Sequence, residues 1–115
     1  MNKNHKSNLA EWKCQPCSVG ALALTDNEIR DLLAELQGEW RVINGHHLER
    51  KIVFPNFIAG LSFTNKLGEL AEKEGHHPNI YLTYNYVTVT IWTHKIDSLS
   101  KNDFILAAKC DELLV

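Results

Sequence analysis

The alternating run NIYLTYNYVTVTIWT, residues 79–93, constrains the fold more than any other part of this chain. Apolar and polar side chains alternate through it with a period of two, which is typical of strands that bury one face. A turn at Asn85–Tyr86 would bring apolar residues together in three cross-strand pairs: Tyr84 with Val87, Leu82 with Val89, and Ile80 with Ile91. The run therefore predicts a β-hairpin that packs its apolar face on a core.

The same register has a consequence for two histidines at the open end of this hairpin. Continued past the apolar pairs, it places His77 opposite His94, on the face that points away from the core. Pro78 favours an extended backbone at His77, which limits the directions open to that side chain. His76 stands one residue earlier, and we expect it to reach the same rim. The sequence thus predicts three imidazoles close to one another.

Three other segments have helical spacing, and each has its own start signal. Thr25 and Glu28 have the form of a capping box, Asn56 is a suitable N-cap, and Ser100 precedes Asp103 by three residues. The apolar positions recur every three or four residues: Ile29, Leu32, Leu33 and Leu36, then Phe57, Ile58, Leu61, Leu67, Leu70 and Ala71, then Phe104, Ala107, Ala108 and Leu114. We expect the first helix to stop at Gly38, the second at Gly75, and the third to run to the last residues.

A second hairpin is predicted around Asn44-Gly45, which is a strong turn signal between alternating runs. A three-residue turn through His46 sets Val42 opposite Leu48 on one face. The resulting order is helix, strand, strand, helix, strand, strand, helix. This order favours a single α+β domain, with a four-stranded antiparallel sheet and helices packed on one of its faces.

The first 20 residues are polar and lack a periodic pattern, so we interpret them as an extension and residues 21–115 as the domain. Cys14 and Cys17 form a C-x-x-C pair in the extension, and Cys110 stands alone. A tetrahedral zinc site needs two more ligands, which no second C-x-x-C supplies. We expect a reduced pair in a segment that packs on the domain, with metal or redox chemistry as the alternative.

Composition excludes several classes of protein. The 115 residues carry 12 Lys and Arg against 14 Asp and Glu, and a net charge of −2 offers no basic surplus for nucleic acid. The amino terminus has no long apolar run, so we expect neither a signal peptide nor a membrane span, and a cytoplasmic protein.

Three neighbouring imidazoles indicate proton transfer, because histidine titrates near neutral pH and can both give and take a proton. Zinc binding by three histidines is one alternative, and ordinary solvated histidines at strand ends are another. His46 and His47 also stand side by side, but they fall in a hairpin turn. From the sequence we expect replacement of His46 to leave turnover unchanged.

The stretch EKEGHHPNIYLTYNYVTVTIWTHKIDSLSKND resembles the signature of the pterin-4a-carbinolamine dehydratase family. The matching positions keep the family's order and spacing: Glu72-Lys73, His76-His77-Pro78, Tyr84, Val87, Thr93-His94, Leu99-Ser100 and Asp103. The similarity covers the chain from about residue 21 to its end. It implies a dehydratase that removes water from a 4a-hydroxy-tetrahydropterin, with no metal and no cofactor, since the pterin is the substrate.

The resemblance also implies roles for the histidines. His76 and His94 correspond to the acid/base pair, and His77 to a residue that positions the pterin and helps to transfer protons. These are the catalytic residues that we predict.

Four further residues are assigned supporting roles by the same resemblance. Asp103 either orients a histidine or closes the capping box of the last helix, and both roles can hold together. Glu72 lies either on the pocket rim or on a solvated helix face, and Trp40 is either pocket wall or core. Pro78 shapes the site and does no chemistry.

The resemblance implies partners as well. Family members form homodimers or homotetramers, and an aromatic amino acid hydroxylase supplies their substrate. An alternative from another class is a non-catalytic binding module, because some relatives act as a dimerisation cofactor or assist assembly of a carboxylase.

Overall fold

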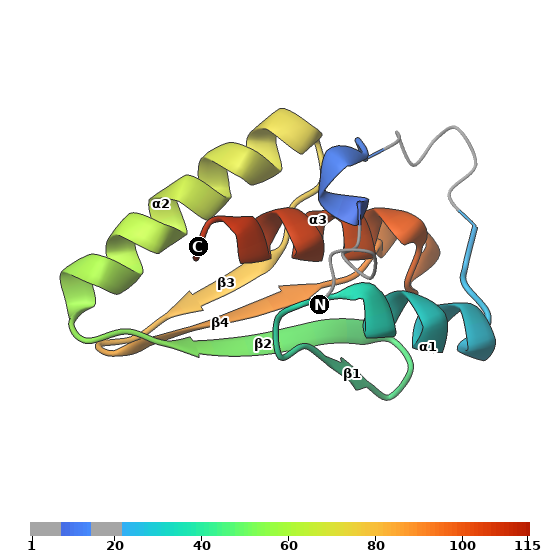
Figure 1. Cartoon of the computed structure of the whole chain (residues 1–115), viewed down its shortest axis with the longest axis horizontal. Helices are drawn as coiled ribbons and strands as arrows, with labels where there is room; N and C mark the ends of the chain where they lie inside the picture. The colour runs from blue at the N-terminus through green and yellow to red at the C-terminus, as the bar shows by residue number, and fades with distance from the viewer. Residues whose placement is uncertain (1–7, 15–21) are drawn as a thin grey trace, which may run out of the picture.

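The structure, a computed structural model, describes residues 8–14 and 22–115. These residues form three helices, four strands and two short 3-10 helices (Figure 1). The elements follow in this order: η2 (Leu9–Glu11), α1 (Asp26–Glu35), β1 (Arg41–Ile43), β2 (His47–Val53), α2 (Phe57–Glu74), β3 (Asn79–Leu82), β4 (Tyr86–Ile91), η4 (His94–Ile96) and α3 (Lys101–Glu112). The predicted order of helices and strands is confirmed.

The four strands form one antiparallel sheet in the order β1-β2-β4-β3, with the helices on one of its faces (Figure 1). The α+β class is therefore confirmed. Burial alternates along β4, where Val87, Val89 and Ile91 are fully buried. The β1–β2 turn also follows the prediction, since Val42 pairs with Leu48.

The register of the β3–β4 hairpin differs from the prediction. Leu82 pairs with Val87 and Ile80 with Val89, so the turn lies at Tyr84–Asn85 and Tyr84 is exposed. Each partner is two residues away from the predicted one, and a shift of two keeps every side chain on its own face. Alternation alone cannot detect such a shift. In the observed register the Asn85 carbonyl oxygen, at the turn, accepts a hydrogen bond from the Phe54 amide at the end of β2.

Helix α2 begins and ends as predicted, but its buried stripe agrees with the predicted one only at Leu67 and Ala71. The side chain of Asn56 caps the Ala59 amide, and Gly75 ends the helix with φ of 68°. Phe57 and Ile58 are exposed, whereas Gly60, Phe63, Leu67 and Ala71 are buried. Gly60 belongs to this stripe because a Cβ atom there would come within 3.2 Å of the Leu82 side chain.

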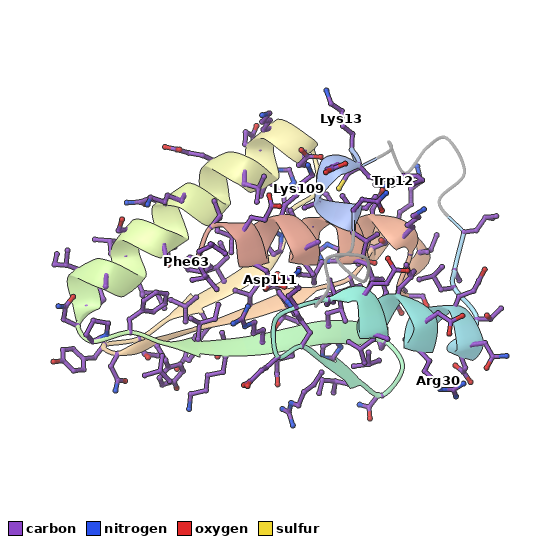
Figure 2. The ribbon with its side chains drawn as sticks, in the orientation of Figure 1. Trp12, Lys13, Arg30, Phe63, Lys109 and Asp111 are labelled. Atoms are coloured by element: carbon purple, nitrogen blue, oxygen red, sulfur yellow. The ribbon has the colours of Figure 1, made fainter. Side chains whose placement is uncertain are left out.

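Helix α3 lies between the sheet and the amino-terminal segment. The predicted capping box of Ser100 and Asp103 is present. On the outer side, Leu9 of η2 is 2% exposed, and Lys109 Nζ donates to the Ala10 carbonyl at 2.7 Å (Figure 2). This double cover explains why α3 is buried on most of its surface.

The end of α1 corrects another prediction. The helix has the predicted capping box at Thr25 and Glu28, but it ends at Glu35 and not at Gly38. The Gly38 amide instead donates to Asp111 of α3. Within the described ranges, no helix is long and apolar enough to cross a membrane.

Candidate active site

His76 is buried at the junction between α2 and β3. The left-handed Gly75 reverses the chain there, and the His76 amide donates to the Ala71 carbonyl of the last helical turn. The His76 ring is 6% exposed, and its Nε2 lies 2.6 Å from Oδ1 of Asp103. Because a carboxylate can only accept, Nε2 carries the hydrogen. Within the described residues, the other ring nitrogen, Nδ1, has no hydrogen-bond partner.

Asp103 connects His76 to the segment that carries His94. It is fully buried, and its Oδ2 accepts hydrogen bonds from the Ser100 amide and the Thr93 hydroxyl, both at 2.8 Å. Thr93 Oγ1 also lies 2.7 Å from Ser100 Oγ. One carboxylate thus caps α3, holds His76 and fixes the residue before His94. Both of the roles considered for Asp103 occur together.

His77 is solvent-exposed, and Nε2 of its ring lies 2.9 Å from Oε1 of Glu72 on the last turn of α2. Both side chains are largely exposed, so this pair contributes little to stability. Pro78 follows directly and leads into β3. His77 therefore presents an imidazole to solvent beside a carboxylate.

His94 is also exposed and opens the 3-10 helix η4. Its ring packs on Trp92, with 4.3 Å between the ring centroids. The backbone between Thr93 and Ser98 closes on itself through two hydrogen bonds. The position of His94 is therefore set by this short loop and by the indole ring.

The predicted pairing of His77 with His94 is wrong. Strand β3 begins at Asn79 and β4 ends at Ile91, so neither histidine lies in the sheet. The three histidines nevertheless leave the same end of the β3–β4 hairpin, since Asn79 is opposite Thr90. We call His76, His77 and His94 the histidine site.

Trp40 lies apart from the histidine site. Its side chain is 6% exposed, and Nε1 donates to Asp111 at 2.9 Å. Asp111 also accepts from the Gly38 amide and pairs with Arg50. Of the two roles considered for Trp40, the structure places it in the core.

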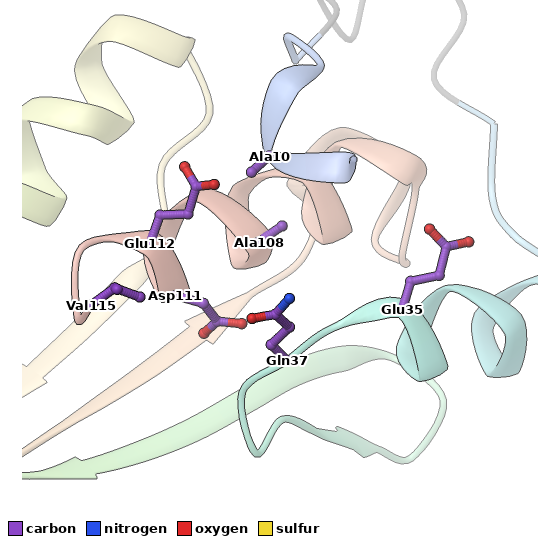
Figure 3. A pocket seen from close by; sticks show the side chains of 7 residues that line it. All are labelled: Ala10, Glu35, Gln37, Ala108, Asp111, Glu112 and Val115. Atoms are coloured by element: carbon purple, nitrogen blue, oxygen red, sulfur yellow. The ribbon is translucent and has the colours of Figure 1, made fainter. Parts of the chain in front are cut away.

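The described residues contain no group of three or more His, Cys, Asp or Glu side chains arranged to hold a metal ion. A hollow of about 480 Å³ lies elsewhere, between η2 and the ends of α1 and α3 (Figure 3). Among the described residues, its polar lining consists of Glu35, Gln37, Asp111 and Glu112, and none of the described lining residues is a histidine. The hollow and the histidine site are separate features.

The amino-terminal segment supports both ends of the His76–Asp103 contact. The Cys14 amide donates to Oε1 of Glu74, two residues before His76, and Cys14 Sγ contacts the carbonyl of Asn102, next to Asp103. Burial opposes ionisation of Glu74, but the Cys14 amide and the Lys109 ammonium outweigh it and lower the pKa of that carboxyl. Cys14 is a free thiol, and its segment packs on the domain as expected. Cys17 lies outside the described residues, so the state of the pair stays a prediction.

The two described cysteines predict an alkaline limit to stability. Burial, helped by the charge of Glu74, raises the pKa of Cys14 to about 12, and burial, helped by Asp111, raises the pKa of Cys110 to about 12. An unfolded thiol titrates at 9.0, so the folded state keeps its full advantage below that value and loses it as pH rises toward 12. We expect the free energy of unfolding, measured in urea, to fall between about pH 8 and about pH 10.5. In a Cys14→Ser, Cys110→Ala double variant, the free energy of unfolding should fall less over the same pH range. An equal fall would contradict the prediction.

Sequence reasoning missed several residues around the histidine site. Trp92 has no role in the sequence-based prediction, yet its indole packs against the ring of His94. Thr93 appeared only as a matching position, although its hydroxyl binds Asp103. The spacing Trp92-Thr93-His94 could have indicated Trp92, because it is a large aromatic residue on the outer face two positions before His94. No sequence signal indicated the contacts of Cys14.

Comparison with known proteins identifies the family. The sequence profile of the family described as pterin 4 alpha carbinolamine dehydratase matches residues 22–113. A candidate pterin-4-alpha-carbinolamine dehydratase of Alkaliphilus metalliredigens is 54% identical over 106 residues, which are 92% of this chain and 96% of the relative. Another, from Rickettsia canadensis, is 52% identical over 90% of this chain and 94% of its own. A match of this length includes part of the amino-terminal extension.

Solved structures agree with these relatives. The crystal structure of a transcriptional coactivator/pterin dehydratase from Brucella melitensis is 30% identical, with a TM-score of 0.75 over 80% of this chain and 98% of that one. A pterin dehydratase-like protein identified as a RuBisCO assembly factor in the alpha-carboxysome is 25% identical, with a TM-score of 0.58 over 67% and 90%. The chain therefore belongs to the pterin 4 alpha carbinolamine dehydratase family, a family of hydro-lyases.

Proposed function

We propose that this protein removes water from a 4a-hydroxy-tetrahydropterin and releases the quinonoid dihydropterin. The observation that carries the proposal is the buried contact of His76 with Asp103. The same carboxylate also accepts a hydrogen bond from Thr93, the residue before His94. Family membership supplies the substrate class, and the contact supplies groups able to move protons.

The proposed reaction needs two proton movements. The 4a-hydroxyl is a poor leaving group, so a protonated imidazole gives it a proton as the C4a–O bond breaks and water departs. N5 of the pterin loses its proton, and that electron pair forms the N5–C4a double bond. The water and the quinonoid dihydropterin together contain all atoms and electrons of the substrate. We therefore propose a reaction without a metal or redox cofactor.

We assign His76 and His94 to these two proton movements. With its Nε2 hydrogen donated to Asp103, His76 presents the Nδ1 lone pair as a base. Once Nδ1 is protonated, the carboxylate stabilises the imidazolium and the ring becomes an acid, as in other Asp–His pairs. His94 supplies the second exposed imidazole on the neighbouring segment. His77, beside Glu72, is assigned to positioning the pterin and to proton transfer.

A second candidate function is a non-catalytic binding module. It is favoured by the likeness to the RuBisCO assembly factor and by the likeness to the Brucella protein, which is described as a transcriptional coactivator as well as a pterin dehydratase. Against it stands the complete histidine site, since a protein that only binds a partner does not require three imidazoles and a buried carboxylate. We therefore prefer the dehydratase.

The proposal includes a cytoplasmic homodimer or homotetramer that works beside an aromatic amino acid hydroxylase, which would release the 4a-hydroxypterin. The family resemblance supports this part. Sedimentation of the purified chain would measure its oligomeric state.

The direct test is an assay of the purified protein. We expect it to accelerate the loss of water from freshly generated 4a-hydroxy-tetrahydropterin, followed by the absorbance of the quinonoid product. A rate equal to that in buffer would overturn the dehydratase and leave the binding module. Elemental analysis of the same sample tests the three-histidine metal alternative, for which stoichiometric zinc is required.

A further inference from the structure

The β1–β2 turn reaches the histidine site, although the sequence placed His46 and His47 in a turn without a role. Leu48 of β2 pairs with Ile91 of β4, so the residues before Leu48 lie beside those after Ile91. The rings of His46 and His47 lie 5.4 Å and 5.8 Å from the indole of Trp92. His94 contacts the same indole at 4.3 Å. The indole of Trp92 thus packs against imidazole rings from the β1–β2 hairpin and from the loop of His94.

A second contact joins the turn directly to the loop of His94. Nε2 of His46 lies 2.7 Å from Oδ1 of Asp97, and Nδ1 of His46 lies 3.0 Å from Nδ1 of His47. The Asp97 amide donates to the His94 carbonyl, which closes the 3-10 turn. Whatever holds the Asp97 side chain therefore also limits the movement of His94.

The backbone of Asp97 has an unusual conformation. Its φ of 50° lies in the left-handed region, which few residues other than glycine adopt. The loop carries no side-chain cap hydrogen bond at Thr93. The hydrogen bond with His46 connects the exposed side chain of Asp97 to the β1–β2 turn.

We propose that His46 is a positioning residue of the histidine site. By binding Asp97 and packing on Trp92, it holds the loop that carries His94 in the place needed for proton transfer. The inference rests on the proposed function, and it replaces the sequence-based expectation that His46 has no part in turnover. A displacement of about 1 Å can lower a rate by about a hundredfold, so loss of this support should be measurable in the turnover.

The kinetic test uses His46→Ala, Asp97→Ala and the double variant. We expect kcat to fall about tenfold in each single variant, with KM changed less than about twofold, because the loss is one of orientation. The double variant should lose no more than the single ones, since the two residues act through one contact. His46→Gln should recover part of kcat, because its amide can donate to Asp97.

The matched control is Arg41→Ala. It breaks another 2.7 Å ion pair, between Arg41 and Glu49, on the same β1–β2 hairpin but away from His94. Its kcat should equal that of the unchanged protein. Melting temperatures of all these variants should stay close together, because exposed ion pairs contribute little to stability. A His46→Ala rate equal to that of Arg41→Ala, or losses that multiply in the double variant, would overturn the proposal.

A second measurement separates this inference from the proposed function. The NMR signals of the His94 ring and the Trp92 indole should move in His46→Ala and in Asp97→Ala, but not in Arg41→Ala. This readout needs no substrate. If the unchanged protein fails to dehydrate the pterin, the proposed function fails while the signals still test the positioning role. Signals that stay in place in all three variants would refute that role.

Discussion

Replacing His94 by alanine is expected to lower the dehydration rate by about a hundredfold to ten-thousandfold, the range of general acid/base catalysis. The fold should remain intact, because the His94 side chain is exposed and its main contact is the face of Trp92. Steady-state kinetics with 4a-hydroxy-tetrahydropterin, together with the melting temperature, measures both quantities.

Lys95→Ala is the matched control for His94→Ala. Lys95 is the next residue in η4 and is also exposed, so its removal changes the same turn without removing an imidazole. We expect its turnover to equal that of the unchanged protein. If the two variants had the same activity, His94 would have no role in proton transfer.

Replacing Asp103 by asparagine is expected to lower both turnover and stability. Asp103 accepts from His76, the Thr93 hydroxyl and the Ser100 amide, and an asparagine can offer only one oxygen to these three donors. Breaking such a buried pair costs about 3 kcal/mol in the free energy of unfolding. Turnover should fall at least about a hundredfold, because the His76 ring loses the carboxylate that stabilises its protonated form. Urea unfolding and single-temperature kinetics measure the two losses.

Asp111→Asn separates the two effects of Asp103→Asn. Asp111 is a second largely buried carboxylate on α3. Its partners are Trp40, Gly38 and Arg50, none of which belongs to the histidine site. It should lose stability but keep the turnover of the folded fraction. Thr93→Val removes only one hydrogen-bond donor to Asp103. If the Asp103→Asn variant does not fold, the turnover of Thr93→Val can still be measured. Equal turnover for Thr93→Val, Asp111→Asn and the unchanged protein would show that the carboxylate network takes no part in the reaction.

The fold was largely predictable because the strand and helix signals are local. The alternation of β4, the turn at Asn44-Gly45 and the caps at Thr25, Asn56 and Ser100 act within a few residues, and each is present as predicted. The errors concern longer-range packing. In α2, the sheet selected Gly60 and Phe63 for its contact and left Phe57 and Ile58 exposed, since helical periodicity alone does not orient the helix.

The position of the three histidines at one end of the β3–β4 hairpin was predictable, but their arrangement was not. A shift of two residues leaves each side chain on the same face, so the sequence pattern could not distinguish the true register from one that pairs His77 with His94. The contact of His76 with Asp103 joins residues 27 positions apart, and only its capping-box half is a local signal. The approach of His46 to Asp97 spans 51 positions and carries no local signal.

The sequence by itself determined the elements, their order, the buried face of each strand and the presence of three histidines at one end of a hairpin. These depend on backbone preferences and on periods of two or about 3.6 residues, which neighbouring residues specify. Only the tertiary structure decided which nitrogen meets which carboxylate. That choice follows from how α3 packs against the sheet and from the pairing of β2 with β4, which bring Asp103 to His76 and His46 to the loop of His94.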